Sequence, residues 1–470
     1  MARLDGGQLT ALGVQLAVTQ WALVGVSTIY IGLIGGLGVR ELAAGGLALM
    51  LFDQVRNTCA GLISATENRV AGVLGELDRF GAASESVADT GIEDVLRSSF
   101  LIATGSGLLG TMLLVGLGWA LRWMSQDLQV VGGARVVLLG LAPGLVPSLW
   151  FLVLRQYLVG RQRPRKLMLV ALAAVPLNAG LGLMFIHGWG GFPALGLTGF
   201  GIAMSVGYTL IFVALWTAVR TDRELGPALP HGPARPTGHS VRTDLRLGTP
   251  IALTYGAETG MFSLLATVMG ALGPEALAAY TVVSQLMHIA AQAATGLAHG
   301  ASVLVSHAVA RHRSHEARAV AWGALRRATV VPICAGLLYL FWADWIVRLF
   351  LHGDTADTVA DLARWLLLMA VLLQFFHAGQ HLGIALLRGL QATTAGFLLA
   401  ITGSWAIGIP AAVLLAFPAG FGALGALTGL GLGMAATSAL TLRHFFYRFE
   451  PSFNGVGPKQ LSPAPEWHLP

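Results

Sequence analysis

Long apolar runs recur along the whole chain, and short polar connections separate them. A run of about 20 mainly apolar residues can cross about 30 Å of hydrocarbon as an α-helix, so this pattern predicts a series of membrane-spanning helices. We count about twelve such runs, at 10–36, 41–68, 95–122, 130–156, 166–187, 194–219, 247–272, 276–307, 323–349, 357–388, 392–416 and 420–446. The first run is long and many others follow it, which favours a membrane helix over a cleaved signal peptide.

The composition agrees with helices in a bilayer. Only 11% of the residues are charged and 55% are hydrophobic, whereas about 25% of the residues of a soluble domain are charged. A soluble protein needs charge on its outer surface, and the long uncharged stretches leave nothing to cover one. A membrane β-barrel would show alternating segments of about ten residues, while the 61 glycines suit close packing of membrane helices. We therefore predict an all-α membrane protein.

The basic residues concentrate in alternate connections between the predicted helices. Loops rich in Arg and Lys face the cytoplasm, so both termini and the central linker are predicted to be cytoplasmic. Because these charges lie in short loops beside the membrane, the net charge of +6 does not indicate nucleic-acid binding. Only two of the 29 basic residues are Lys. That bias is typical of a GC-rich bacterial genome and favours a location in the cell inner (cytoplasmic) membrane.

The chain consists of two similar halves. GGLGVRELAAG at 35–45 and GALGPEALAAY at 270–280 share six of eleven residues at an offset of 235. A second pair, LTGFGIAM at 197–204 and LTGLGLGM at 427–434, shares five of eight residues. A polar, proline-bearing stretch separates the halves. The predicted division is an amino-terminal six-helix lobe at 1–220, a cytoplasmic linker at 221–244, a carboxy-terminal six-helix lobe at 245–446 and a cytoplasmic tail at 447–470.

This repeat points to transport. Each half contains six predicted helices, an even number, so both copies have the same orientation in the membrane. Parallel repeats are related by an axis along the membrane normal, and in transporters the two bundles rock around a central site. We therefore predict two pseudo-symmetric six-helix bundles that form a transporter.

An acidic residue in the middle of a predicted membrane helix is the clearest candidate for function. Glu258 lies within 247–272, close to Thr254 and Tyr255. Such an ionisable side chain costs about 3 kcal/mol on insertion scales, so it indicates a functional site. It can take up a proton, bind Na⁺ or meet a cationic substrate. The structural alternative is a protonated Glu that hydrogen-bonds a neighbouring helix.

Two further pairs of polar residues lie in predicted helices. His377 and His381 are four residues apart and face the same way; they are candidates for proton exchange near neutral pH, or else hydrogen-bonded packing residues. A metal site is not predicted, because no third ligand accompanies the pair in the sequence. Asp53 and Arg56, three residues apart, are consistent with a structural ion pair and with a gate.

Two long segments resemble the multidrug and toxic compound extrusion (MATE) family. The segment at 246–285 is similar to the start of the family's second half, with Gly-x-Pro-Ile, a Glu, a Phe, Gly-x-Leu-Gly and an Ala-Ala pair. The segment at 154–203 resembles the family's fourth to sixth helices, including an Asn and the turn Gly-Phe-Pro-Ala-Leu-Gly. With the first helix and the LLRG that ends the tenth, the similarity extends to about residue 446.

The resemblance implies two six-helix lobes in a V, and export of organic, often cationic compounds in exchange for Na⁺ or H⁺. It implies that Glu258 fills the family's acidic position in helix seven, and that Asn178 fills the position of an Asn in the amino-terminal cavity. The sequence departs from the family where Ser27 replaces a helix-one aspartate and His377 replaces the helix-ten aspartate of Na⁺-coupled members. A Na⁺ site of oxygen ligands would lose a carboxylate here, so we predict H⁺ coupling with Glu258 as the proton carrier.

The resulting functional prediction is a secondary active exporter, or antiporter, of small organic compounds or a metabolite. A flippase for lipid-linked precursors shares this helical plan and is the main alternative; a membrane protein that does not transport is another. No Ser-His-Asp order, Gly-x-Ser-x-Gly or Walker loop supports an enzyme. We expect a small organic substrate and the lipid bilayer as partners, no nucleic acid, no cofactor beyond the coupling H⁺ or Na⁺, no metal, and a monomer.

Overall fold

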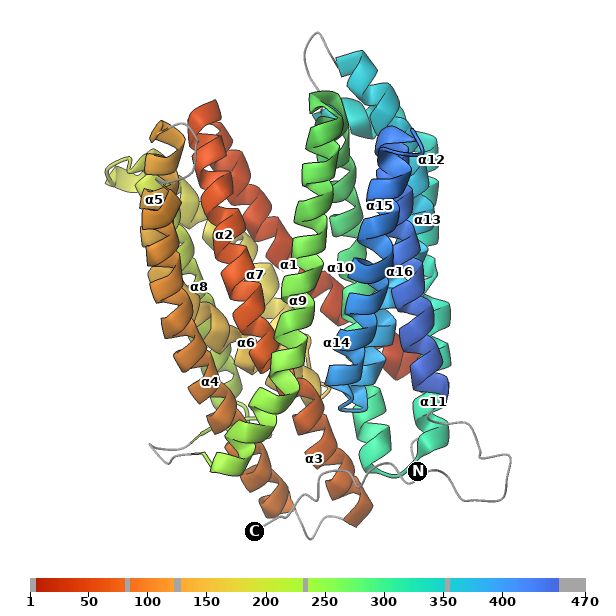
Figure 1. Cartoon of the computed structure of the whole chain (residues 1–470). Coiled ribbons are helices and arrows are strands. Elements are labelled where there is room, and N and C mark those ends of the chain that lie inside the picture. Colours follow the sequence, from red (N-terminus) through yellow and green to blue (C-terminus); the bar gives the residue numbers. More distant parts are fainter. Residues whose placement is uncertain (1–5, 81–84, 122–127, 231–235, 351–355, 448–470) are drawn as a thin grey trace. The chain divides into compact units, whose positions relative to one another are not determined.

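The computed structural model describes residues 6–80, 85–121, 128–230, 236–350 and 356–447, and these ranges contain helices and turns but no strand (Figure 1). The predicted cytoplasmic tail lies outside the described residues from 448 onward. The helices are α1 (Gly6–Gly35), α2 (Val39–Ile63), α3 (Thr66–Phe80), α4 (Glu85–Ala120), α5 (Leu128–Leu141), η3 (Ala142–Gly144), α6 (Leu145–Gly160), α7 (Arg165–His187), η4 (Trp189–Gly191), α8 (Gly196–Arg220), α9 (Gly238–Leu272), α10 (Pro274–Ala310), α11 (Ser314–Ala328), α12 (Val330–Phe350), α13 (Ala356–Gly389), α14 (Thr393–Ile401), η5 (Thr402–Gly408), α15 (Ile409–Ala416) and α16 (Gly422–Tyr447).

These helices correspond to the predicted apolar runs. Within the described residues, ten helical stretches are long and apolar enough to cross a membrane. The two remaining predicted runs coincide with α2 and α10, which are 25 and 37 residues long and so exceed the length of about 20 residues that a bilayer requires. Charged residues of α2, such as Asp53 and Arg56, reduce its apolar character. The all-α architecture predicted from the sequence is confirmed.

Four local features differ from the predicted elements. The run at 130–156 is interrupted by η3, where Pro143 cannot donate a backbone hydrogen bond. The run at 392–416 contains the π-helical turn η5 between α14 and α15; such turns are rare and frequently occur at functional sites. The charged, amphipathic helix α3 follows α2 as a separate element, and α9 begins at Gly238, inside the predicted linker at 221–244.

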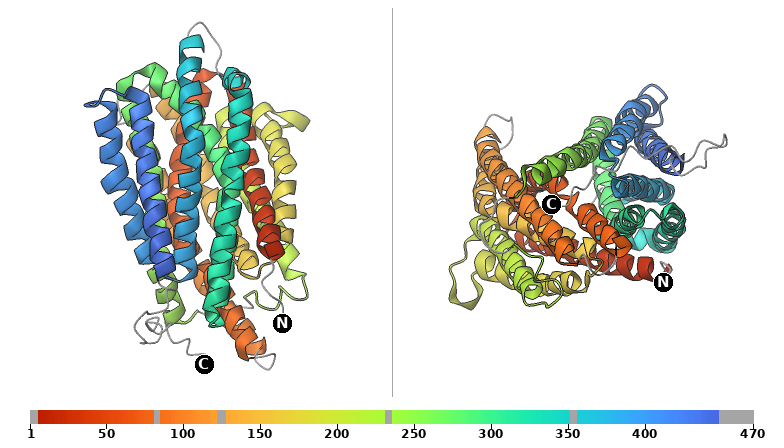
Figure 2. Two further views of the ribbon diagram at one scale, coloured as in Figure 1. Left: turned by 90° about the vertical axis from the view of Figure 1, so that its right-hand side faces the viewer. Right: turned by 90° about the horizontal axis from the view of Figure 1, so that it is seen from below.

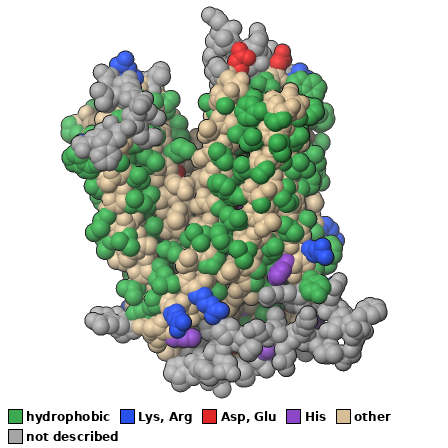
Figure 3. All heavy atoms as spheres, viewed as in Figure 1, with side chains coloured by type: hydrophobic (Ala, Val, Ile, Leu, Met, Phe, Trp, Pro, Cys, Tyr) green, Lys and Arg blue, Asp and Glu red, His purple; other side chains and the backbone are tan. Residues whose placement is uncertain are grey.

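The outward side chains of these helices are largely apolar. Leu109 and Met112 of α4 and Phe341 of α12 are each 69% exposed. On the face shown in Figure 3, hydrophobic side chains cover most of the middle of the helices, and most of the Lys, Arg, Asp and Glu side chains coloured there lie toward the helix ends. Large exposed apolar surfaces mark contact with a membrane or a partner, and here they follow helices of spanning length. The chain is a multi-pass membrane protein.

Residue contacts divide the chain into two compact units. The carboxy-terminal unit comprises Met1–Ala17, Ala71–Val87 and Ala257–Pro470, and the amino-terminal unit comprises Val18–Val70 and Ala88–Gly256, each as far as it is described. The boundaries fall inside α1, α3, α4 and α9. Because the units follow packing and not chain order, the division into lobes at the linker stays a prediction.

The start of α1 thus belongs to the carboxy-terminal unit and the start of α9 to the amino-terminal unit. A matching helix contact is found at each of these two helix starts. In the amino-terminal unit, Gly61 of α2 lies so close to Ala252 of α9 that an added Cβ would clash with the Ala252 backbone. In the carboxy-terminal unit, a Cβ added at Gly296 of α10 would likewise clash with the backbone of Ala17 of α1. Both glycines and both alanines are related by the offset of 235 that relates the sequence repeats. The same small-residue helix crossing is therefore formed twice, which supports the pseudo-symmetry predicted from the repeats.

Each unit has a core of its own. In the amino-terminal unit, α8 packs against α5, α6 and α7, and α2 packs against α5. Tyr30, Tyr157 and Phe200 are among the large side chains buried there. In the carboxy-terminal unit, α13 packs against α10, α12 and α16, and α15 packs on α16; the views in Figure 2 show these blue and green helices side by side. Helix α13 thus reaches the centre of its unit, where it carries both candidate histidines.

The two units also repeat a helix–helix turn. Gln162 after α6 and Gln391 after α13 have φ angles of 57° and 58°, a left-handed conformation that is uncommon outside glycine. The backbone N–H of Arg163 donates to Leu158 and that of Ala392 donates to Leu387, each at 2.9 Å. These hydrogen bonds satisfy carbonyls at the end of the preceding helix. The same uncommon turn therefore ends a helix in each unit, and His312 after α10 forms it once more, with a φ of 56° and a hydrogen bond from the Arg313 N–H to Ala308 at 3.0 Å.

Candidate functional site

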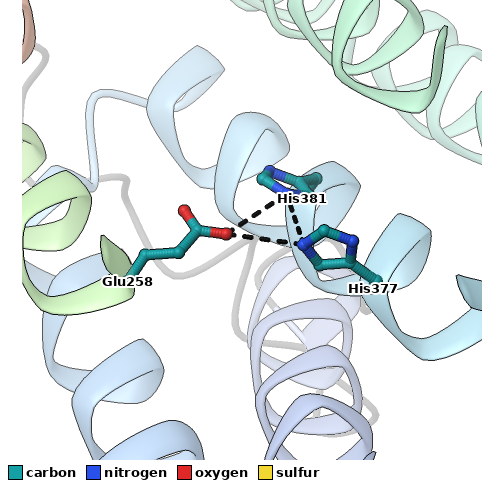
Figure 4. A group of neighbouring side chains, drawn as sticks. All are labelled: Glu258, His377 and His381. Carbon is teal, nitrogen blue, oxygen red and sulfur yellow. Dashed lines mark hydrogen bonds and ion pairs between the residues drawn. The ribbon is translucent and has the colours of Figure 1, made fainter. Parts of the chain in front are cut away.

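Glu258 and the two candidate histidines meet in the carboxy-terminal unit. Figure 4 shows Glu258 on α9 with its carboxylate directed at both imidazoles of α13. Its Oε1 lies 3.2 Å from Nε2 of His381 and 3.5 Å from Nε2 of His377. The side chain of His377 is 7% exposed, and those of Glu258 and His381 are 20% and 21% exposed. The sequence predicted each residue separately, and the structure brings the three together.

The helix geometry of α13 pairs the histidines. Residues four apart lie one above the other on a helix face, and the Nε2 atoms of His377 and His381 are 2.9 Å apart. Which nitrogen donates depends on the tautomer of each ring. The two rings are inclined by 63° with their centres 4.4 Å apart. Three groups that can each carry a proton therefore share one small volume.

Two aromatic side chains border this cluster. Phe262, one turn after Glu258 on α9, presents its ring to His377 at a centroid distance of 6.1 Å and an angle of 74°. Trp405 of η5 donates its indole N–H to the carbonyl of Ala257 at 3.1 Å. A Cβ at Gly260 would lie 3.3 Å from the Trp405 ring, so the indole rests against α9. The π-helical turn therefore supports the stretch of α9 that carries the acid.

Two basic side chains complete the electrostatic surroundings. Arg388, buried near the end of α13, interacts with both Glu258 and His381. His299 of α10 interacts with His381. Neither residue was predicted as part of the site, yet the sequence carries a signal for Arg388. It lies eleven residues after His377, which is about three helical turns, so both occupy the same face of α13.

The other predicted residues of α9 and α1 make local hydrogen bonds. Thr254 is buried and its hydroxyl donates to the carbonyl of Pro250 at 2.8 Å, and Tyr255 is half-buried. The hydroxyl of Ser27 donates to the carbonyl of Val24 at 2.9 Å. These residues belong to the amino-terminal unit, whereas Glu258 belongs to the carboxy-terminal unit. Their assignment to one functional site stays a prediction.

Asn178 lies at a buried polar contact of the amino-terminal unit. Its Nδ2 donates to the carbonyl of Ala174 at 2.8 Å, and its Oδ1 accepts from the hydroxyl of Tyr30 at 3.1 Å. Both side chains are buried. The contact ties α7 to α1 through a buried polar interaction, so Asn178 holds these two helices together.

Asp53 and Arg56 form the expected ion pair on α2. Nε of Arg56 lies 3.2 Å from Oδ1 of Asp53, and their side chains are 31% and 38% exposed. Tyr208 of α8 interacts electrostatically with both residues. Such an accessible pair contributes little to stability, which leaves the choice between a structural pair and a gate open.

The most deeply buried ion pair among the described residues was not predicted. Arg69 of α3 pairs with Asp244 of α9, and their side chains are only 4% and 3% exposed. Asp244 also accepts a hydrogen bond from Ser98, and Arg69 donates to Ser240. Asp244 falls within the polar stretch that the sequence assigns to a solvated linker, so its burial could not be read from composition.

Known proteins resemble this chain over most of its length. The MatE family model matches residues 16–184 and 250–414. A probable multidrug resistance protein NorM of Pseudomonas aeruginosa is 32% identical over 421 residues, which cover 87% of this chain and 83% of the relative. A protein of the same name from Deinococcus radiodurans is 30% identical, and the match covers 94% of this chain and 95% of the relative.

A solved structure has the same fold. The crystal structure of the eukaryotic MATE transporter AtDTX14 matches with a TM-score of 0.83 and covers 94% of this chain and 96% of that chain. The two sequences are 19% identical in that match, so it shows the fold alone.

Proposed function

The chain belongs to the MatE family of efflux transporters, and from this premise we propose that it exports small organic compounds or a metabolite in exchange for H⁺. The names of its relatives, which are probable multidrug resistance proteins, support foreign organic compounds as the substrate class. In this proposal the chain is a secondary active antiporter, so an ion gradient supplies the driving force.

The observation that carries the proposed coupling is the contact of one carboxylate with two imidazoles. Oε1 of Glu258 lies within 3.5 Å of Nε2 of both His377 and His381. A proton can pass among groups at such distances without large side-chain movements. Two of the three donors are nitrogen atoms, whereas hard cations favour oxygen ligands. The donor set therefore supports H⁺ over Na⁺ as the coupling ion.

In the proposed cycle, Glu258 alternates between a carboxylate and a carboxylic acid. The carboxylate attracts a cationic or hydrogen-bond-donating substrate, and protonation removes that attraction. Proton uptake then favours substrate release, and proton loss to the cytoplasm restores binding. His377 and His381 hold the exchanging proton near Oε1.

We further propose that the protein lies in the inner membrane with both termini in the cytoplasm. The Arg residues that follow α6 and α10, among them Arg161, Arg163 and Arg311, support this orientation. A protease-protection or cysteine-labelling experiment on the linker at 221–244 would test it, because labelling from the outside of intact cells would reverse the assignment.

Transport by the purified protein in proteoliposomes tests the coupling. A pH gradient should drive uptake of a fluorescent organic cation, and an equal Na⁺ gradient should not. Glu258→Gln keeps the size of the side chain and removes its titratable group, so it should abolish pH-driven transport. Glu275→Gln, at an exposed carboxylate in the first turn of α10, is the matched control and should transport normally.

The alternatives give different results in the same assay. Full pH-driven transport by Glu258→Gln would rule out its role as the proton carrier. Transport driven only by Na⁺ would refute H⁺ coupling, and movement of a labelled lipid-linked precursor in place of the dye would favour a flippase.

A further inference from the structure

We propose that Glu258, His377 and His381 also form a binding site for a divalent transition-metal ion of the Zn²⁺ type. The sequence shows only two of these ligands side by side, because His377 and His381 share α13. The fold supplies the third from α9, and the three donor atoms lie within 4.8 Å of one another. Two histidines and one carboxylate are a ligand set that proteins use to bind zinc with a fourth position open.

The distances between the donors fit a tetrahedral ion without rearrangement. The three donor–donor distances are 2.9 Å, 3.2 Å and 3.5 Å. Ligands about 2.0–2.1 Å from a tetrahedral zinc ion are about 3.3 Å apart, which is close to the mean of the three. An ion seated on this triangle would contact Oε1 of Glu258 and Nε2 of both histidines, with its fourth position directed away from them.

The surroundings hold the ligands in this arrangement. The spacing of four residues fixes His377 and His381 on one face of α13, and the ring of Phe262 lies beside His377 at a centroid distance of 6.1 Å. Trp405 supports α9 at Ala257, the residue before Glu258. The partial exposure of Glu258 and His381 leaves an approach for an ion and for a water ligand.

The charges around the site favour a metal that bonds well to imidazole. Arg388 and His299 interact with the cluster, and a positive charge on either opposes any cation. Affinity must therefore come from the ligand bonds and not from an excess of negative charge. Imidazole nitrogen suits Zn²⁺, Cu²⁺ and Ni²⁺, whereas Mg²⁺ and Ca²⁺ prefer oxygen. We expect the site to bind Zn²⁺ and Co²⁺ and to discriminate against Mg²⁺ and Ca²⁺.

Titration of the full-length protein with Co²⁺ tests the site directly. The protein must carry no histidine tag, because the imidazoles of a tag would themselves bind Co²⁺. The visible absorption of Co²⁺ reports its geometry, so the wild-type protein should bind one ion with a strong tetrahedral spectrum that Zn²⁺ abolishes. Glu258→Gln, His377→Gln and His381→Gln should each weaken binding at least about 100-fold, because loss of an outer-shell partner alone costs about 10–100-fold.

His288→Gln is the matched control. This histidine is exposed on α10 and hydrogen-bonds to Gln292 at 2.8 Å, so its loss should leave the Co²⁺ spectrum and affinity unchanged. Elution as a single species and an unchanged melting temperature without metal identify the variants that fold. Any folded triad variant that binds Co²⁺ as the wild type does would overturn the site, as would a wild-type spectrum of octahedral form.

Metal binding at this site would also regulate transport. The ion would occupy the atoms that exchange the proton, so Zn²⁺ should inhibit pH-driven efflux by the wild-type protein. This consequence rests on the proposed function, but the Co²⁺ titration does not. Tight binding together with unchanged efflux would leave the metal site standing and overturn the role of the triad in coupling. Inhibition of the residual efflux of His381→Gln by the same fraction at the same Zn²⁺ concentration would place the inhibitory metal elsewhere and overturn this consequence.

Discussion

Replacement of Asp244 by Asn should strongly destabilise the protein, although the change removes only one charge. The carboxylate of Asp244 faces the guanidinium of Arg69, and both side chains are almost completely buried, at 3% and 4% exposure. Asp244→Asn leaves the Arg69 charge buried and without its counter-ion. Removal of one partner from such a pair costs about 3–5 kcal/mol, and the remaining hydrogen bonds to Ser240 place the expected loss toward the lower end.

The Asp53–Arg56 pair is the matched comparison because it joins the same residue types in the same unit. Its side chains are 31% and 38% exposed, so Asp53→Asn should cost less than about 1 kcal/mol. Unfolding in detergent, followed by intrinsic fluorescence during a temperature or denaturant ramp, compares the two variants with the wild type. The variant at 244 should unfold clearly first.

A double substitution shows whether Asp244→Asn destabilises the protein because it leaves a buried charge uncompensated or because it removes a specific contact. If an uncompensated charge is the cause, Arg69→Met combined with Asp244→Leu should be more stable than either single variant, because apolar replacement of a buried pair is often neutral. Equal stability of Asp244→Asn and the wild type would refute the reasoning. So would a double variant that loses the sum of both single effects.

Three further substitutions have defined outcomes. Gly61→Ala forces the backbones of the crossing helices α2 and α9 apart and should lower the free energy of unfolding by about 1–3 kcal/mol. Gly46→Ala, on the same helix with no heavy atom within 4 Å of the added Cβ, should be neutral. Equal melting temperatures of the two variants would contradict this. The hydrogen bond from Lys166, with backbone N–H groups, lowers the pKa of Asp222 to about 2, below its ordinary value of about 3.9. The pair therefore stabilises the fold above about pH 4 and loses this contribution as the pH falls toward 2, so the difference in melting temperature between wild type and Lys166→Met should shrink over that range; a constant difference would refute it. Trp405→Phe removes the indole hydrogen bond beside Glu258 and should slow pH-driven transport with little loss of expression, while an unchanged rate would show that this contact does not position the acid.

The helical architecture was predictable because lipid imposes one simple rule. Every spanning segment must be long and apolar, so the runs in the sequence correspond closely to the helices. The offset of 235 found in the sequence repeats also relates Gly61 and Gly296, whose matching contacts appeared only in the structure. The exchange of helix starts between the units was not predictable, because it depends on which helix each glycine meets. Helix α3 escaped the pattern because its charged residues interrupt the apolar run.

The site was predicted residue by residue but not as an assembly. Glu258, His377 and His381 stand out because ionisable groups are rare at membrane depth. The pattern of apolar residues does not show which helices pack together. It therefore could not predict that α9 brings Glu258 within 3.5 Å of His377 and His381 on α13. Trp405 belongs to a π-helical turn, which a run of apolar residues does not reveal. Asp244 lies in a polar, proline-bearing stretch, so its sequence context predicted exposure and not burial.

The most direct test of the account measures proton movement itself. A substrate gradient imposed on proteoliposomes that contain a trapped pH-sensitive dye should drive protons in the opposite direction through the wild-type protein, at equal Na⁺ on both sides. The same gradient should move no protons through Glu258→Gln, and Glu275→Gln should behave as the wild type does. Proton movement that persists in Glu258→Gln, or that requires Na⁺ in the wild type, would contradict the assignment of Glu258 as the group that couples H⁺ to export.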